Sequence, residues 1–177
     1  VVHGAFVLDA DLQIRGGKSL MTRPDDDTVR PIDRAVRVTD SFRSGLAPIF
    51  ERYLHVQSAL ADDKSDEARS TASRMKSAVV DFSPQQPAEA AEVWRTQKKN
   101  LVEAIERVVA ADSIDGARKH FEAVTATMKE LLTRFGNPLD RPLRVAHCPM
   151  AFDSRGADWL QTSDQIQNAY FGDEMLR

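Results

Sequence analysis

Apolar positions recur at alternating steps of three and four residues through most of residues 42–135, the spacing of one buried face on an α-helix. Four such stretches follow one another with short polar segments between them. The first two stripes are Phe42, Leu46, Ile49, Tyr53, Val56 and Leu60, then Ala68, Ala72, Met75, Val79 and Phe82. The last two are Val93, Trp94, Leu101, Ile105 and Val108, a stripe that Gln97 interrupts, then Ile114, Ala117, Phe121, Val124, Met128, Leu131 and Phe135.

Capping residues mark the ends of these stretches. Ser113 is a predicted N-cap and Gly136 a predicted stop for the fourth helix, while Pro87 suits the first turn of the third. Pro48 either kinks the first helix or marks its first turn. Four helices with short connections predict a mainly α fold, an up-down four-helix bundle over residues 36–141.

The residues before the bundle have a different pattern. Residues 4–15 alternate apolar and polar positions around Asp9 and Asp11, which predicts a short N-terminal β segment that belongs to a neighbouring domain. The following residues contain two adjacent glycines, two prolines and an acidic run, a composition that breaks helices and strands. We therefore assign residues 1–21 to the end of a β domain and residues 22–35 to a linker, and we expect both chain ends to be cut from something longer.

After Pro142 the helical period disappears. Residues 142–177 are rich in turn-forming residues and carry four aromatic side chains, Phe152, Trp159, Tyr170 and Phe171. We expect an irregular C-terminal tail that packs on the bundle through these aromatic side chains.

Composition narrows the function classes. A hydrophobic fraction of 42% is that of an ordinary globular domain, and a net charge of -3 offers no broad cationic surface for nucleic acid. No stretch of the sequence has about 18 continuous apolar residues, the length needed to span a bilayer. A single cysteine excludes an internal disulfide, so Cys148 needs another explanation.

The tail contains a cluster of soft metal donors. His147, Cys148 and Met150 place imidazole, thiolate and thioether groups within four residues, and Met175 is a fourth donor at the other end of the tail. Such ligands suit Cu(I) or Ag(I). These four residues are the candidate metal site, and the bound metal is not expected to be required for folding.

Two other interpretations of the same residues stay open. Cys148 and Met150 are also residue types that pack as small or flexible apolar groups, which would anchor the tail to the bundle. Cys148 as a nucleophile activated by His147 is disfavoured, since neighbours in sequence rarely align as nucleophile and base. No other catalytic motif is present, so we expect no enzymatic activity.

The ends of the chain resemble a known family. The tail segments are His147-Cys148-Pro149-Met150-Ala151, Trp159-Leu160-Gln161, 166–172 (Ile-Gln-Asn-Ala-Tyr-Phe-Gly) and Met175-Leu176. They resemble a domain, once catalogued as of unknown function, at the C-terminus of some periplasmic adaptor (membrane fusion) subunits of RND-type heavy-metal efflux systems. Residues 4–16 resemble the end of the membrane-proximal β domain of copper and silver adaptors. The family usually has Pro where Ala169 stands, and its tail continues into a Cys-Gly that is absent here.

The resemblance implies a non-enzymatic role in cation efflux. The full-length protein would be periplasmic and membrane-associated, and would bridge an inner-membrane RND pump and an outer-membrane channel, with a second copy of the chain as a further candidate partner. The C-terminal domain would bind or deliver Cu(I) or Ag(I) through the donor cluster. The alternative is a structural interaction module of the efflux assembly without a metal site.

Overall fold

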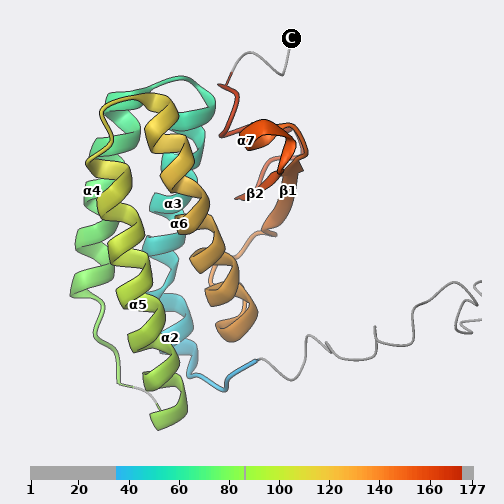
Figure 1. Ribbon diagram of the computed structural model, residues 1–177. Coiled ribbons are helices and arrows are strands. Elements are labelled where there is room, and N and C mark those ends of the chain that lie inside the picture. Colours follow the sequence, from blue (N-terminus) through green and yellow to red (C-terminus); the bar gives the residue numbers. More distant parts are fainter. Residues whose placement is uncertain (1–34, 86, 173–177) are drawn as a thin grey trace, which may run out of the picture. The chain divides into compact units, whose positions relative to one another are not determined.

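The computed structural model describes residues 35–85 and 87–172, which form one compact unit (Figure 1). The N-terminal β segment, the linker up to residue 34 and Met175 lie outside the described residues. The helices are α2 (Asp40–Gly45), α3 (Ala47–Ala61), α4 (Ser65–Asp81), α5 (Ala88–Val109) and α6 (Ile114–Phe135). The predicted mainly α fold with a helical bundle is confirmed.

The helix boundaries follow the local chemistry. Ser113 is the N-cap of α6, where its hydroxyl accepts a hydrogen bond from the Gly116 amide at 3.1 Å, and Gly136 ends the helix with a φ of 81°. The stretch predicted as one helix from Phe42 is two helices, because Pro48 lies in the first turn of α3 and has no amide to donate to a preceding turn. Pro87 is the N-cap residue of α5 and not its first helical residue.

Neighbouring helices in the sequence pack side by side, α3 on α4, α4 on α5 and α5 on α6, so the four long helices run up and down. The predicted apolar stripes face inward, and Met75, Leu101, Ile105 and Met128 are fully buried. Aromatic rings fill one end of the core, where Phe42 contacts Trp94, Phe82 and Phe135 edge-on or tilted. The core is therefore the one that the hydrophobic pattern predicts.

The C-terminal tail is more regular than its sequence suggests. Strands β1 (Arg144–Cys148) and β2 (Ala157–Gln161) pair antiparallel, with Ala146 opposite Trp159 and His147 opposite Asp158. The short element α7 (Ala151–Ser154) connects them, and β2 packs against α3 and α6. Trp159 and Leu160 are buried there. None of the described helices combines the length and apolar composition that a membrane crossing requires.

Candidate functional site

The structure separates two of the predicted metal donors, His147 and Cys148. His147 and Cys148 are neighbours on β1, so their side chains point to opposite faces of the strand. The His147 side chain is 56% exposed, whereas Cys148 is buried at 2% exposure. Met150 is 55% exposed. Among residues 35–85 and 87–172, no group of three or more His, Cys, Asp or Glu residues is arranged to hold a metal ion.

His147 instead belongs to a polar network across the hairpin. Its Nδ1 lies 2.7 Å from Oδ1 of Asp158, and the Lys129 ammonium of α6 donates to the other carboxylate oxygen. The bond from Lys129, then that from His147, holds the pKa of Asp158 below its usual value. A carboxylate on Nδ1 is the arrangement that orients histidines that bind metals through Nε2. His147 therefore has Nε2 as a possible metal donor that does not depend on Cys148.

Gly156 makes room for the His147 ring. It has a φ of 80°, and a Cβ placed there would lie 2.8 Å from Cε1 of His147 and 3.0 Å from Nε2. Both the backbone conformation and the close approach favour glycine. The orientation of the imidazole thus depends on the small residue beneath it as well as on Asp158.

The connection between the strands has a left-handed backbone. Phe152, Asp153 and Ser154 have φ values of 53°, 58° and 66°, so α7 is a left-handed turn and not an α-helical one. Each non-glycine residue in this region costs about 1–2 kcal/mol. Hydrogen bonds close the turn, among them the one from the Gly156 amide to the Ala151 carbonyl at 3.0 Å. Three consecutive strained residues at one place mark a segment that the surrounding contacts hold in position.

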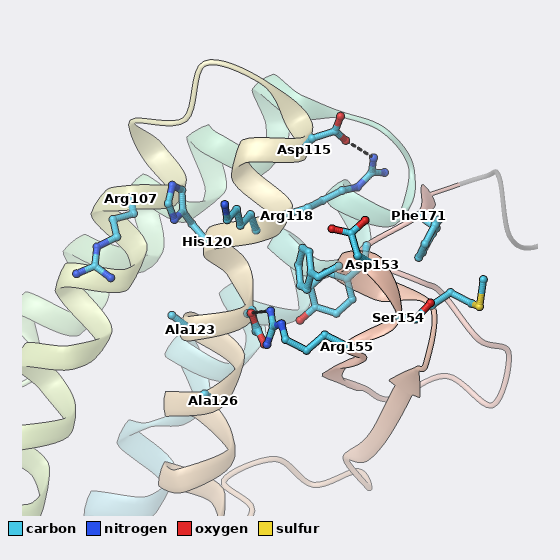
Figure 2. Close-up of a pocket in the computed structure, with 15 residues that line it drawn as sticks. Arg107, Asp115, Arg118, His120, Ala123, Ala126, Asp153, Ser154, Arg155 and Phe171 are labelled. Carbon is cyan, nitrogen blue, oxygen red and sulfur yellow. Dashed lines mark hydrogen bonds and ion pairs between the residues drawn. The ribbon is translucent and has the colours of Figure 1, made fainter.

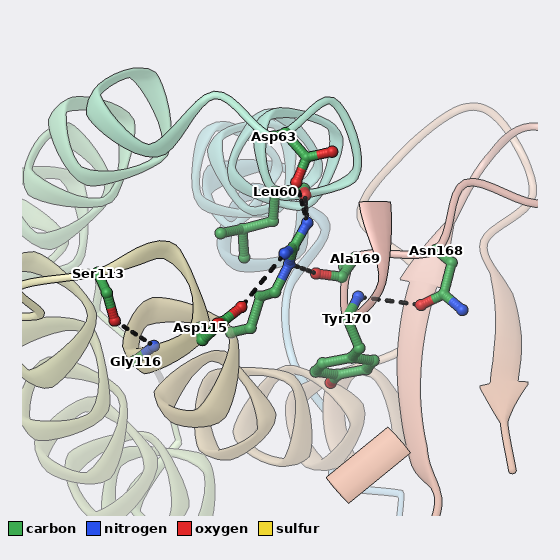
Figure 3. A network of polar contacts seen from close by, with 9 residues as sticks. Leu60, Asp63, Ser113, Asp115, Gly116, Asn168, Ala169 and Tyr170 are labelled. Atoms are coloured by element: carbon green, nitrogen blue, oxygen red, sulfur yellow. Dashed lines mark hydrogen bonds and ion pairs between the residues drawn. The ribbon is translucent and has the colours of Figure 1, made fainter. Parts of the chain in front are cut away.

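Arg118 of α6 ties the end of the tail to the bundle, through acceptors on Leu60, Asp63 and Ala169 that Figure 3 labels. Its side chain is only 8% exposed. The guanidinium donates to the Leu60 carbonyl at 2.8 Å, to Asp63 at 2.7 Å and to the Ala169 carbonyl at 3.2 Å. One side chain thus connects α6, the turn between α3 and α4, and the C-terminal tail. A buried guanidinium needs several acceptors, and two of them here are the backbone carbonyls of Leu60 and Ala169.

Two further side chains of α3 reach the tail. The buried Tyr53 hydroxyl accepts a hydrogen bond from the Leu160 amide at 3.0 Å and lies 2.8 Å from the Thr125 hydroxyl. Burial raises the pKa of Tyr53, so the hydroxyl stays protonated. Gln57 donates to the Gln167 carbonyl at 2.7 Å. We call residues 144–172, held by Arg118, Tyr53 and Gln57, the clasp.

The aromatic residues of the clasp stand out in the sequence, whereas its polar anchors do not. Tyr53 stands on an apolar stripe, and a buried tyrosine needs a partner for its hydroxyl, which was an available signal. Arg118 gave no such signal, because an arginine beside a stripe is usually solvated. Asp158 lies beside His147 only because the two strands pair in this register, which the sequence does not specify.

The family comparison matches the bundle. A family model described as a protein of unknown function (DUF3347) matches residues 49–139, which run from α3 to just beyond α6. No curated protein and no solved structure matches the chain. Because the matched residues make up just over half of the 177-residue chain, the chain belongs to the DUF3347 family of proteins of unknown function.

Proposed function

We propose that this domain is a non-enzymatic interaction module of a periplasmic heavy-metal efflux adaptor, in which the clasp completes a rigid helical bundle. The observation that carries the proposal is the burial of clasp residues and of Arg118, which holds them. Trp159 is 1% exposed, Cys148 is 2% exposed and the Arg118 side chain is 8% exposed. A tail built for reversible metal capture through a thiolate would leave that thiol accessible, whereas here Cys148 serves as a packed apolar residue.

The adaptor context comes from the resemblance of both chain ends to that family. Under this proposal the domain lies in the periplasm, and its partners are the inner-membrane RND pump, the outer-membrane channel or another adaptor copy. A large, rigid surface presented by a bundle suits such docking, because little conformational entropy is lost on binding.

Direct capture of envelope proteins tests this role. The chain of 177 residues is immobilised and a detergent-solubilised envelope extract of the host is passed over it, with an Arg118→Met chain as the matched bait. We expect RND pump or outer-membrane channel subunits, identified by mass spectrometry, to be enriched on the wild-type chain and reduced on the variant. Absence of both subunit classes from the wild-type eluate would refute the proposal.

Metal handling is the second candidate function. The specific observation in its favour is that Asp158 fixes Nδ1 of His147 while the Met150 side chain stays exposed. Cu(I) or Ag(I) would then bind His147 and Met150, with Met175 as a further candidate ligand and Cys148 dispensable.

An anaerobic Ag(I) titration separates the two candidates. The interaction module predicts no stoichiometric binding that depends on the tail donors. The metal site predicts tight binding that a His147→Asn, Met150→Leu double variant loses and that Cys148→Ser leaves unchanged. A loss that follows Cys148→Ser alone would contradict the assignment of that residue to packing.

A further inference from the structure

A groove separates the N-terminal half of α6 from the turn of the clasp (Figure 2). Its volume of about 1140 Å³ exceeds that of most small-molecule pockets, which enclose about 300–1,000 Å³. The exposed small residues Ala123 and Ala126 of α6 line it, and Phe152, Arg155 and Phe171 line it from the clasp. A groove of this size with a shallow helical side suits a peptide segment better than a metabolite.

Apolar side chains in the groove are accessible. Met150 is 55% exposed, and Phe152 and Phe171 are partly exposed. Phe152 is fixed by an edge-on contact with Tyr170, whose ring centroid lies 5.3 Å away, and by Arg155 over its face. Ordered aromatic rings and an exposed methionine are the groups that anchor peptide partners at low entropic cost.

The charges of the groove favour an acidic partner. Glu122 is neutralised by two hydrogen bonds from Arg155, at 2.6 and 2.7 Å, and Asp115 is paired with Arg118. Arg107 and Lys119 also line the groove, and neither makes an ion pair or a hydrogen bond with another side chain of the described residues. The third carboxylate of the groove is the exposed Asp153, so four cationic side chains leave one positive charge in excess, in a chain whose net charge is -3.

The strained turn of the clasp faces the same groove. Phe152, Asp153 and Ser154, the three consecutive left-handed residues, all line the groove. Strain of this kind collects at binding sites, where it holds side chains in a conformation they would not otherwise adopt. The turn presents the Phe152 ring and the Arg155 guanidinium on the groove side.

We propose that the groove between α6 and the clasp turn docks an acidic peptide segment with an apolar side chain at its centre. The apolar side chain lies against Phe152, Phe171 and Met150, while the carboxylates of the peptide face Arg107 and Lys119. This inference rests on the proposed interaction role and specifies its partner by chemistry. It does not require the partner to be an efflux component.

A peptide titration of the full 177-residue chain tests the inference. The probe is acetyl-Asp-Asp-Phe-Leu-Asp-Asp amide, followed by ¹⁵N amide shifts. One control peptide has Lys for every Asp, and a second has Ser for Phe and Leu. We expect shift changes confined to the groove residues and weaker binding of both controls by roughly tenfold or more. Equal binding of the lysine peptide, or no shift change at millimolar probe, overturns the proposal.

Charge reversal supplies the matched variants. Arg107→Glu with Lys119→Glu is expected to weaken probe binding roughly tenfold, while Arg95→Glu with Lys99→Glu, on exposed positions of α5 outside the groove, leaves it unchanged. Equal weakening by both pairs overturns the proposal, as does concentration-dependent dimerisation that the groove variant alone abolishes. Peptide binding without pump or channel capture would refute the efflux role and leave the groove assignment intact.

Discussion

The bundle and the clasp are held together by different physical means. The four long helices meet through fully buried apolar side chains such as Leu101 and Ile105, whose contribution is spread over many non-directional contacts. The clasp also buries Trp159, Leu160 and Tyr170, but side chains from α3 and α6 fix its path through hydrogen bonds to its backbone. Such directional contacts determine one conformation, and a single substitution can remove them. The clasp should therefore be separable from the bundle by mutation.

The largest effect is expected from a cavity in the bundle. Ile105→Ala removes a fully buried side chain of α5, away from the clasp, and should lower the free energy of unfolding by about 2–5 kcal/mol. Urea denaturation followed by far-UV circular dichroism measures the loss. Hydrogen exchange should accelerate in helices and clasp alike, because the clasp has no support without the bundle. Faster exchange in the clasp alone would contradict the dependence of the clasp on the bundle.

An intermediate effect is expected at Arg118. Arg118→Met keeps much of the apolar stem but leaves the buried Leu60 and Ala169 carbonyls without their donor, a loss of about 2 kcal/mol. Its bond to Asp63 adds little, because that carboxylate is about half exposed. Hydrogen exchange should accelerate in residues 157–172 while α4 and α5 stay protected. Arg95→Met, at an exposed position of α5, is the matched control, and uniform acceleration in the Arg118 variant would contradict a separable clasp.

The smallest effect depends on pH. Lys129 and His147 hold the pKa of Asp158 below its ordinary value of 3.8, so the folded state favours the ionised form and gains stability above that pH. The gain is lost as the pH falls below about 4 and the carboxylate takes up a proton. Asp158→Asn should accordingly be less stable than wild type at pH 6, with the difference shrinking below pH 4, as thermal unfolding across that range would reveal. Asp164→Asn, at a largely exposed ion pair, is the control, and a difference independent of pH would argue against this role of Asp158.

The same contrast explains what the sequence could predict. Helix α6 has an apolar stripe of seven residues, an N-cap at Ser113 and a stop at Gly136. Each of these signals acts within a few residues along the chain. The hairpin lacks such a signal, because its strands have only five residues and small residues such as Ala146 and Ala157 at buried positions. The left-handed turn has no glycine at Phe152, Asp153 or Ser154, so its three positive φ values could not be predicted, although Asp153 and Ser154 are turn-forming residue types.

The candidate metal site shows most directly what sequence spacing cannot predict. Three soft donors within four residues look like a cluster in the sequence, but the alternation of a strand separates His147 from Cys148. Asp158, which does contact His147, lies 11 residues away from it, and Lys129, which donates to Asp158, lies 18 residues away. Neither partner can be identified without the fold. Sequence spacing predicts contacts within a helix far better than contacts across a hairpin.

The span of the Arg118 contacts also has a kinetic consequence. Its partners Leu60, Asp63 and Ala169 lie 58, 55 and 51 residues away along the chain, whereas successive helices of the bundle meet across short turns. Contacts that close long loops tend to form late in folding, so Arg118→Met should speed unfolding and leave the refolding rate nearly unchanged. Stopped-flow refolding that slows in this variant would place the clasp in the folding nucleus. With an unchanged refolding rate, the clasp would set how long the native state lasts, while the helices would set how quickly it forms.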